Sequence, residues 1–471
     1  MSEISFPDSW AESSLSSLIS IQGLISDGDW VESKDQDPSG LVRLIQLADI
    51  GDGDFRDKSD RYMTHDKANA LNCTYLKQGD VLIARMPDPL GRACIFPGVN
   101  QDAVTVVDVC LIRTGNNSAM SNELLKYWIN SPVIRSRIEL NASGTTRKRI
   151  TRKKLEEFNF PVPPLAEQKV IVDKLDNLLS QVESIKARLE RIPEILKQFR
   201  QSVLAAAVSG KLTEAWRVAK GITIETWKYE AAKNVCEKVQ SGSTPRENPF
   251  DQDGTVPFLK VYNIVDQKID FDYKPQFITS ETHSKGSSAR SVAFPNDVLM
   301  NIVGPPLGKV AILTNQFPEW NLNQAITLFR VKKELLDHKY LYYVLCEGAL
   351  VRDVMPETKG SVGQVNISLS QCREAILPVP SIEEQREVVL CIDKLFNNAD
   401  VIDRYVHSAL NRVNNLTQSI LAKAFRGELT VDWREANPEL ISGENSAEAL
   451  LEKIKAERSA RPVTKRGKGK A

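Results

Sequence analysis

Apolar residues recur at alternating intervals of four and three in two stretches of the chain. The first stretch runs from Ile171 to Val203 and the second from Val388 to Ile420. This spacing is typical of the heptad seam of a coiled coil, so it predicts two long helices that pair along one seam. The alternative, ordinary helices packed in a globular core, fits the strict spacing over more than four heptads less well. The predicted seam residues are Ile171, Leu175, Leu178, Val182, Ile185, Leu189 and Leu196 with Val388, Ile392, Leu395, Ile402, Val406, Val413 and Leu416.

Local signals set the expected ends of these helices. The first is expected to begin after Pro163-Pro164, since proline suits a helix start. The second is expected to begin after Ser381, with Glu384 at the spacing of a capping box. Pro193 removes a helical hydrogen bond, so we expect a kink or break in the first helix between Glu190 and Pro193.

The two stretches belong to an internal duplication with an offset of 217 residues, the interval from Trp10 to Trp227. Short motifs repeat at this offset, and residues 161–217 align with 378–434 without a gap. The segments before them have diverged much more. This difference predicts that the two copies share a structural framework but that their domains contact different targets.

The duplication predicts a mixed α+β fold in which two globular α/β domains are separated by two long helices. Because the first helix leads into the second domain and the second helix follows it, the two helices must pair antiparallel, as a coiled coil with pseudo-twofold symmetry and one domain at each end. The first helix would span about 48 Å at about 1.5 Å per residue, against about 34 Å for one turn of B-DNA. The expected boundaries are 1–160 and 218–377 for the domains, 161–217 and 378–434 for the helical segments, and 435–471 for a C-terminal helix and disordered basic tail.

Within the domains, apolar runs and amphipathic patterns predict individual elements. Strands are expected at Val81–Ala84, Val104–Ile112, Val298–Ile302 and Val310–Leu313. Helices are expected at Leu124–Ile138, Tyr340–Val354 and Ser446–Arg458.

Composition narrows the class of protein. The 471 residues have a formal net charge of +0, which excludes a uniformly basic nucleic-acid coat but allows a local basic patch. No apolar run reaches the roughly 18 residues of a membrane span. The seven cysteines have wide spacings that suit reduced cytosolic thiols, and the four histidines form no zinc pattern. A cytoplasmic protein without a metal site is therefore expected.

The densest basic cluster is Arg147 to Lys154, which follows the small residues Ser143 to Thr146. Such a loop can approach phosphates and base edges; the alternative is a solvated helix start. The matching segment of the second half keeps the glycines and Lys359 but carries Gln364 and Asn366 in place of cations. Because Arg reads guanine while Gln and Asn read adenine, the pair predicts two domains that read different DNA sequences.

A second pair of loops, 85–92 and 303–309, lies between predicted strands, and each ends in glycine and a cation. The second lacks the spacing and the Ser or Thr of a phosphate-binding P-loop. A cation aimed at DNA and a purely structural turn are the two interpretations left. The candidate DNA-binding residues are Arg43, Arg85, Arg92, Thr145, Arg147, Lys148, Arg149, Arg152, Lys260, Asn263, Lys309, Lys359, Gln364 and Asn366.

Motifs of catalysis are weak or absent. Asn248-Pro249-Phe250-Asp251 lacks the second proline of an amino-methyltransferase motif, and no glycine-rich S-adenosylmethionine loop follows a strand. Pro7-Asp8 with Glu32-Ser33-Lys34 fits only loosely the pattern of a metal-dependent nuclease, and the other half does not repeat it. The sequence thus favours a chain with no catalytic residues of its own.

With this organisation, the whole chain resembles the specificity (S, HsdS) subunits of type I restriction-modification enzymes. The resemblance rests on the duplication and on three motifs: residues 161–168, their counterpart 378–385, and Gly-x-Leu-Thr-x-x-Trp-Arg closing each half. Residues 412–429 and 441–445 resemble the IA subfamily.

The resemblance implies a DNA-binding subunit of a host-defence system. Each domain would be a target-recognition domain for one half of a split, asymmetric site, and the helices would set the spacer and dock partners. The chain would bind double-stranded DNA, two methyltransferase (M) subunits and two motor-nuclease (R) subunits. S-adenosylmethionine, ATP and Mg²⁺ would be needed on those partners, for adenine methylation and ATP-dependent cleavage. The alternatives are a fused methylase or nuclease and a coiled-coil scaffold without DNA readout.

Overall fold

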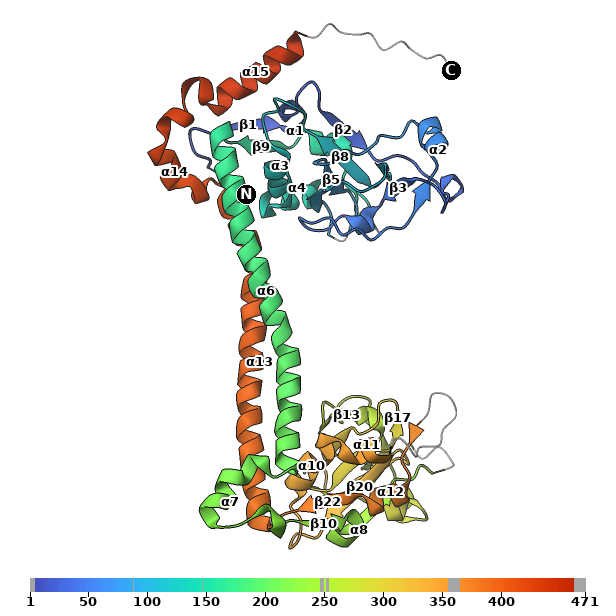
Figure 1. Ribbon diagram of the computed structural model, residues 1–471. Coiled ribbons are helices and arrows are strands. Elements are labelled where there is room, and N and C mark those ends of the chain that lie inside the picture. The colour runs from blue at the N-terminus through green and yellow to red at the C-terminus, as the bar shows by residue number, and fades with distance from the viewer. Residues whose placement is uncertain are drawn as a thin grey trace. The chain divides into compact units, whose positions relative to one another are not determined.

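The computed structural model describes residues 5–87, 89–145, 147–245, 250, 254–354 and 365–460. The chain divides into two compact units, one of Met1–Leu189 with Ser408–Ala471 and the other of Glu190–His407. Each unit contains a domain of strands and short helices, together with one part of each of two long helices, α6 (Leu165–Val208) and α13 (Ile382–Phe425) (Figure 1).

The domain of the first unit is built on three sheets. A four-stranded antiparallel sheet has the order β2-β8-β5-β6, and a three-stranded sheet has the order β4-β3-β7, in which β3 and β7 are parallel. A short ladder of β1 and β9 joins the two ends of the domain. The strands are β1 (Ala11–Ser14), β2 (Leu24–Asp27), β3 (Val42–Ile45), β4 (Tyr62–Met63), β5 (Val81–Ala84), β6 (Ala93–Ile95), β7 (Ala103–Thr105), β8 (Val109–Arg113) and β9 (Asn159–Val162). The helices are α1 (Leu15–Leu18), α2 (His65–Ala70), α3 (Asn122–Asn130), α4 (Pro132–Asn141) and α5 (Arg152–Glu156).

The domain of the second unit repeats this topology. Its larger sheet has the order β11-β20-β16-β18, its three-stranded sheet the order β15-β12-β19, and β10 pairs with β22 as β1 does with β9. Two short ladders, β13-β14 and β17-β21, are added. The strands are β10 (Lys228–Ala231), β11 (Cys236–Ser241), β12 (Val256–Leu259), β13 (Ile264–Val265), β14 (Lys268–Ile269), β15 (Phe277–Ile278), β16 (Val298–Asn301), β17 (Val303–Gly304), β18 (Val310–Ile312), β19 (Asn321–Leu322), β20 (Ile326–Val331), β21 (Val365–Asn366) and β22 (Ile376–Val379). The helices are α7 (Glu214–Lys220), α8 (Ala232–Val235), α9 (Ser280–Ser284), α10 (His338–Glu347), α11 (Ala349–Val354) and α12 (Leu369–Glu374).

The mixed α+β fold and the duplication are therefore confirmed, but two expected elements are corrected. Val104–Ile112 is not one strand: β7 and β8 belong to different sheets, because the chain turns between them with a hydrogen bond from Val109 N to Val106 O of 2.9 Å. The expected helix Leu124–Ile138 is two helices, since Pro132 begins α4 and the Ser131 side chain accepts from Ile134 N.

The expected helix Tyr340–Val354 is likewise divided into α10 and α11. Gly348 lies between them with φ of +91°, a left-handed conformation that glycine adopts at low cost and that ends a helix. The short apolar runs around 81, 298 and 310 form β5, β16 and β18 as expected.

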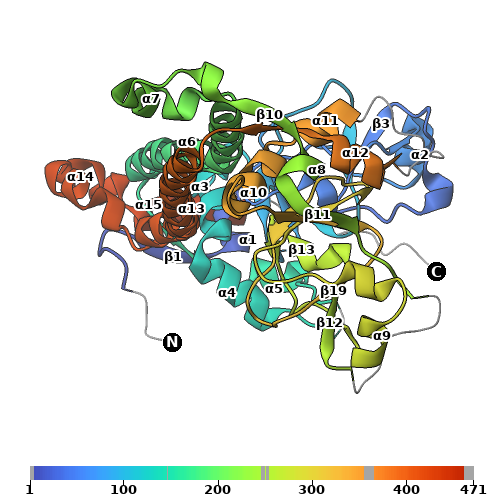
Figure 2. The same ribbon diagram turned by 90° about the horizontal axis from the view of Figure 1, so that it is seen from below.

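In each unit the parts of α6 and α13 pack antiparallel, and Figures 1 and 2 show the two helices side by side. In the first unit, Ile171 and Leu175 of α6 share a buried cluster with Leu421 and Phe425 of α13. In the second unit, Val203 and Leu204, near the end of α6, share a cluster with Val388 and Ile392, near the start of α13. The paired helices are thus confirmed.

The seam is buried unevenly along the two helices. Ile185, Ile402 and Leu416 are 46%, 45% and 43% exposed, while Ile171, Leu175, Val388 and Ile392 are fully buried. Beside its domain a seam residue is covered from two sides, whereas farther along only the facing helix covers it. The burial of the seam residues therefore varies along the helix pair.

The helix ends follow the sequence, but the proline does not interrupt the first helix. α6 begins directly after Pro164 and runs through Pro193 to Val208 without a break. Ser381 Oγ accepts from Glu384 N at 3.2 Å, whereas the Glu384 side chain turns inward. The C-terminal helix α15 (Ala447–Ser459) follows α14 (Val431–Ala436), and the basic run from Lys465 lies outside the described residues.

Candidate nucleic-acid interface

Two candidate cations of the loop 85–92 are buried. Arg85 is 4% exposed, and its guanidinium lies 2.6 Å from Asp27 Oδ1 and donates to the carbonyl of Val107. Burial lowers the pKa of Arg85, and the Asp27 carboxylate opposes this shift. Arg92 is 5% exposed and donates to three backbone carbonyls at 2.6–3.0 Å. Both guanidinium groups are engaged inside the fold, so we leave them out of the proposed DNA contacts.

The side chains of Arg43 and Asn263 also have their partners within the fold. The Arg43 guanidinium lies 2.5 Å from Asp57 and donates to the carbonyl of Ser59 at 2.7 Å. Asn263 is fully buried, and its amide donates to two backbone carbonyls at 2.8 and 3.1 Å. A buried polar group needs such partners, and losing them to reach a duplex would be costly. These two residues hold loops in place.

In the first unit, the loop that begins the basic cluster is exposed. Thr145, Arg147 and Lys148 lie on the surface, while a bridge between Ser143 and Arg149 closes the loop. Thr146 lies outside the described residues. Two exposed cations and a hydroxyl thus stand on a short loop anchored at both ends.

The other two arginines of this cluster are partly neutralised. Arg149 lies 3.3 Å from Asp108, and Arg152 lies 3.5 Å from both Asp27 and Glu156. Their side chains remain 40% and 42% exposed. Because exposed pairs are weak and exchange with solvent, both guanidinium groups can still turn to a phosphate. Sequence reasoning missed Asp27 and Asp108, which lie far away in the chain and come close only through the sheet.

In the second unit the described part of the corresponding surface carries fewer cations. Asn366 is exposed on β21, which pairs with β17. Lys309 is partly exposed, and Lys260 lies with Nζ 4.3 Å from the ring centroid of Phe250. Burial lowers the pKa of Lys260. Lys359 and Gln364 lie outside the described residues.

The two candidate loops of each unit, which the sequence treats as separate, lie against each other. In the first unit Ile150 N donates to the carbonyl of Arg85 at 3.2 Å, and in the second Ile367 N donates to the carbonyl of Ile302 at 2.9 Å. Each domain therefore presents one composite surface made of two loops. This arrangement was invisible to sequence patterns because the contact joins segments about 65 residues apart in each half.

A buried polar cluster repeats at the junction of each domain with its helices. In the second unit Glu384 accepts from Arg217 at 2.5 Å, Thr213 at 2.8 Å and Trp227 at 2.9 Å. In the first unit Glu167 accepts from the equivalent Arg434 and Thr430 at 2.6 Å and from Trp10 at 2.8 Å. The closing motif Gly-x-Leu-Thr-x-x-Trp-Arg thus supplies the Thr and Arg that neutralise a buried carboxylate.

The glutamine after each glutamate has a matching role. Gln168 donates to the carbonyls of Ala119 and Pro163, and Gln385 donates to those of Leu335 and Pro380, at 2.7–2.9 Å. The repeated Glu-Gln pair thus fixes the start of each long helix onto its domain. Its repetition in both halves is the sequence signal that could have revealed these roles.

The described residues hold no group of three His, Cys, Asp or Glu side chains placed to bind a metal ion. Within the same residues, no helix is long and apolar enough to cross a membrane. Burial raises the pKa of Cys94, Cys110 and Cys236 to about 12, so these thiols are poor nucleophiles at neutral pH.

Two similar domains with exposed polar loops, joined to a helix pair by repeated buried clusters, define a class of duplicated, modular binding proteins. A family model for the type I restriction modification DNA specificity domain matches residues 7–194 and again residues 224–404. The chain belongs to this family of type I restriction enzyme specificity subunits. Catalysis in these enzymes lies in partner subunits, and specificity subunits act with DNA and the other subunits of the complex.

Curated relatives agree with the family. The specificity subunit of the type I restriction enzyme EcoBI from Escherichia coli is 40% identical over 338 residues, 69% of this chain and 70% of the relative. That of EcoKI from E. coli strain K12 is 38% identical over 347 residues, 71% of this chain and 72% of the relative. The HsdS subunit from Thermoanaerobacter tengcongensis has the same fold, with a TM-score of 0.59 at 19% identity over 90% of this chain and 98% of that one.

Proposed function

We propose that the chain recognises a bipartite, asymmetric DNA site, with residues 1–160 reading one half-site and residues 218–377 the other. The observation that carries the proposal is the pair of composite loop surfaces at equivalent places in the two units. Their frameworks match, but their polar side chains differ: Arg147 and Lys148 stand on the first, Asn366 on the second. Domains under selection to read one identical sequence would not diverge in this way.

The chemistry of the exposed side chains suggests how each half-site is read. Arginine donates two hydrogen bonds to O6 and N7 of guanine, and asparagine or glutamine pairs with N6 and N7 of adenine. The first surface also carries enough charge to bind phosphates, which contributes most of the sequence-independent affinity. We assign base or phosphate contacts to Thr145, Arg147, Lys148, Arg149 and Arg152 in the first unit, and to Lys260, Lys309, Lys359, Gln364 and Asn366 in the second.

Domain exchange tests the proposal. Residues 1–160 are replaced by the matching domain of another specificity subunit, and the chimera is expressed with the methyltransferase partner. Methylated adenines are then mapped across the genome. One half of the motif should change while the other half and the gap remain. A chimera whose two half-sites both change would exclude independent reading.

We further propose that the helix pair docks two methyltransferase subunits and, through them, two motor-nuclease subunits. S-adenosylmethionine, ATP and Mg²⁺ would bind to those partners, and the assembly would act on cytoplasmic DNA. Support comes from apolar side chains on the outer faces of the helices in the second unit, where Ile195, Leu390 and Tyr405 are 58%, 63% and 71% exposed. Aromatic side chains are enriched in protein interfaces, so we assign docking to the face that carries Tyr405.

The docking proposal is tested with Tyr405→Glu, which places a charge on that face without touching a buried cluster. Co-purification with the methyltransferase subunit should fall at least tenfold, whereas the exposed control Arg404→Glu should assemble more nearly as the native chain does. Equal assembly of both variants with the partner would place docking elsewhere.

A further inference from the structure

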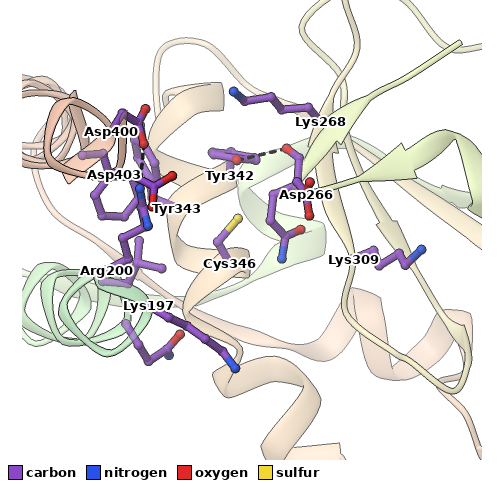
Figure 3. Close-up of a pocket in the computed structure, with 14 residues that line it drawn as sticks. Lys197, Arg200, Asp266, Lys268, Lys309, Tyr342, Tyr343, Cys346, Asp400 and Asp403 are labelled. Carbon is purple, nitrogen blue, oxygen red and sulfur yellow. Dashed lines mark hydrogen bonds and ion pairs between the residues drawn. The ribbon is translucent and has the colours of Figure 1, made fainter. Parts of the chain in front are cut away.

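A recess of about 810 Å³ opens in the second unit where the domain meets α6 and α13. Figure 3 shows four cations around it, Lys197 and Arg200 from α6, Lys268 from β14 and Lys309 from the loop 303–309. Aromatic side chains of α10 form part of its wall. The recess is not explained by the proposed reading of bases.

The first unit has a recess at the equivalent place, but it is smaller and has a different charge. Its volume is about 240 Å³. At the offset of 217, Asn414 and Thr417 stand where the second unit has Lys197 and Arg200. The duplication thus built two recesses from one framework. The second is lined by four cations and by Asp266, Asp400 and Asp403, whereas the first has one cation, Lys186, beside Asp52 and Glu183.

The cations of the second recess are not all used by the protein. Arg200 pairs with Asp400 at 2.6 Å, and Lys197 has only a 3.9 Å contact with Glu194 while its side chain stays 80% exposed. Lys268 and Lys309 make no ion pair within 4 Å among the residues that the structure describes. At least three ammonium groups are therefore available to an anion.

The recess lies beside the proposed reading surface of the same domain. Lys309 lines it and also belongs to the loop whose strand β17 pairs with Val365 and Asn366 of β21. The backbone N of Lys309 donates to Asn301 Oδ1 at 2.6 Å, which fixes the point from which its side chain starts. A duplex that contacts the Asn366 surface would pass within reach of Lys309.

We infer that this recess binds the phosphate backbone of DNA next to the second half-site, through Lys197, Lys268 and Lys309. The inference rests on the proposed function, which it deepens. Ammonium groups are compact point charges on flexible stems, so they suit phosphate neutralisation rather than the bidentate reading of a base. The contact would therefore add affinity without adding a specified base.

The charge distribution of the two units supports this assignment. In the first unit two exposed cations, Arg147 and Lys148, lie on the reading loop itself. In the second unit the described part of the matching loop carries Asn366 instead, and Lys197 and Lys268 are exposed at the recess. Each domain thus has a cationic surface for DNA. It lies on the reading loop in the first domain and at the recess beside the helices in the second.

The test measures DNA affinity of the complete complex of this chain with its methyltransferase subunit. Lys197→Gln and Lys268→Gln are compared with the native chain on target and non-target duplexes across a salt series. Each variant should lower the slope of log affinity against log salt by about 0.9, which is about a 3.5-fold smaller loss of affinity between 50 and 200 mM salt. Binding should weaken equally on both duplexes, and the methylated motif should stay the same.

Two variants control for charge in general. Lys233→Gln removes a half-exposed cation of the same domain, 2.7 Å from Glu374 and away from the recess, and should leave the slope unchanged. Lys268→Arg keeps the charge and should retain the native slope. As a second readout, methylphosphonate groups replace single phosphates beside the second half-site. If replacing one phosphate weakens DNA binding by the native complex, the same replacement should not weaken binding by the lysine variant that has already lost the contact to that phosphate.

Several results would overturn the inference. Native slopes for Lys197→Gln and Lys268→Gln with an unchanged motif would remove the recess contact and leave the two-half-site proposal standing. A variant that relaxes a base in the motif would make the recess a base reader. Weaker assembly with the methyltransferase subunit at a native slope would make it a protein-docking site. The proposed function itself is tested separately, because it fails if domain exchange leaves the motif unchanged or changes both half-sites.

Discussion

At the scale of single residues, the most demanding feature is the buried carboxylate that begins each long helix. Glu384 is 1% exposed and Glu167 is fully buried, and each is surrounded by Arg, Thr and Trp donors. A buried ion pair costs much desolvation, and it is tolerated only where further hydrogen bonds satisfy the remaining lone pairs. The Thr hydroxyl and the indole N–H provide those bonds here.

Removing that charge should destabilise one unit strongly. Glu384→Gln leaves the Arg217 guanidinium buried without its carboxylate, and we expect a loss of about 3–5 kcal/mol from the stability of the second unit. Denaturant unfolding followed through Trp227, which contacts the carboxylate, measures it. The neighbouring Glu383→Gln breaks only an exposed pair with Lys220 and should cost about 1 kcal/mol or less. Equal losses for the two variants would contradict the structural role of the cluster.

The basic loop of the first unit should separate into different kinds of contact. Arg147 is exposed without a protein partner among the described residues, while Arg152 is held near Asp27 and Glu156. Arg152→Ala should weaken binding evenly across sequences and lower the salt slope by about one unit, as loss of a phosphate contact does. Arg147→Ala should cost roughly 1–3 kcal/mol and relax one position of the motif.

Affinity of the assembled methyltransferase for its mapped site, measured over a salt series for each variant, distinguishes these outcomes. The buried Arg92 provides a contrast, because Arg92→Ala should lower stability and leave the motif unchanged. If Arg147→Ala and Arg152→Ala both bind as the native complex does, the loop is a solvated surface.

At the scale of elements, the C-terminal helix α15 completes the first domain. Ile454 is 3% exposed in the core cluster of that domain, and Arg458 donates to the carbonyls of Ser16 and Ile19 at 2.5 Å. These carbonyls lie within α1 and directly after it, and α1 is a helix of one turn that cannot be stable alone. The two ends of the chain thus build one structure.

Shortening one buried side chain tests this dependence. Ile454→Ala should destabilise the first unit by about 2–4 kcal/mol, since it opens a cavity in the core. The exposed neighbour Lys455→Ala should have almost no effect. Hydrogen exchange is the measurement of choice because it resolves the two units: protection should fall in residues 5–189 and remain in residues 190–407. A uniform fall, or none, would show that α15 is not part of the core of the first unit.

At the scale of the whole molecule, buried thiols make stability depend on alkaline pH. Burial raises the pKa of Cys94, Cys110, Cys236 and Cys346 to about 12, whereas a thiol in the unfolded chain titrates near 8.5. Folding thus keeps these thiols protonated. Their contribution is fully present below about pH 8.5 and is lost progressively as the pH rises toward 12, because only the unfolded chain can ionise.

Urea unfolding under reducing conditions from pH 7.5 to 10.5 should therefore give a midpoint that is constant at first and falls above about pH 8.5. Both units should weaken, since each holds buried thiols. Cys110→Ala combined with Cys236→Ala should make the fall shallower. A midpoint that stays level or rises up to pH 10 would contradict protonated thiols in the folded state.

The duplication could be predicted because it is visible in the order of neighbouring residues along the chain. The seam spacing from Ile171 to Val203, its copy from Val388 and the matched ends of both halves are properties of neighbouring residues. Helix period and copied motifs need no knowledge of distant contacts, so the helix pair, its antiparallel direction and the mixed α+β domains followed from the sequence alone. The elements that failed, such as 104–112, were divided by turns whose partners lie elsewhere in the fold.

What only the tertiary structure decided is which polar residues are free. From the sequence alone, four residues are equally good candidates for a DNA contact because each is a cation in a loop: Arg85, Arg92, Arg147 and Lys309. Sheet register brings Asp27 against Arg85, and packing surrounds Arg92 with backbone carbonyls, whereas Arg147 stays in solvent. A buried charge requires partners while an exposed one does not, and burial arises from contacts between segments far apart in the chain. For the same reason the recess at Lys197, Lys268 and Lys309 has no signature in the order of the residues.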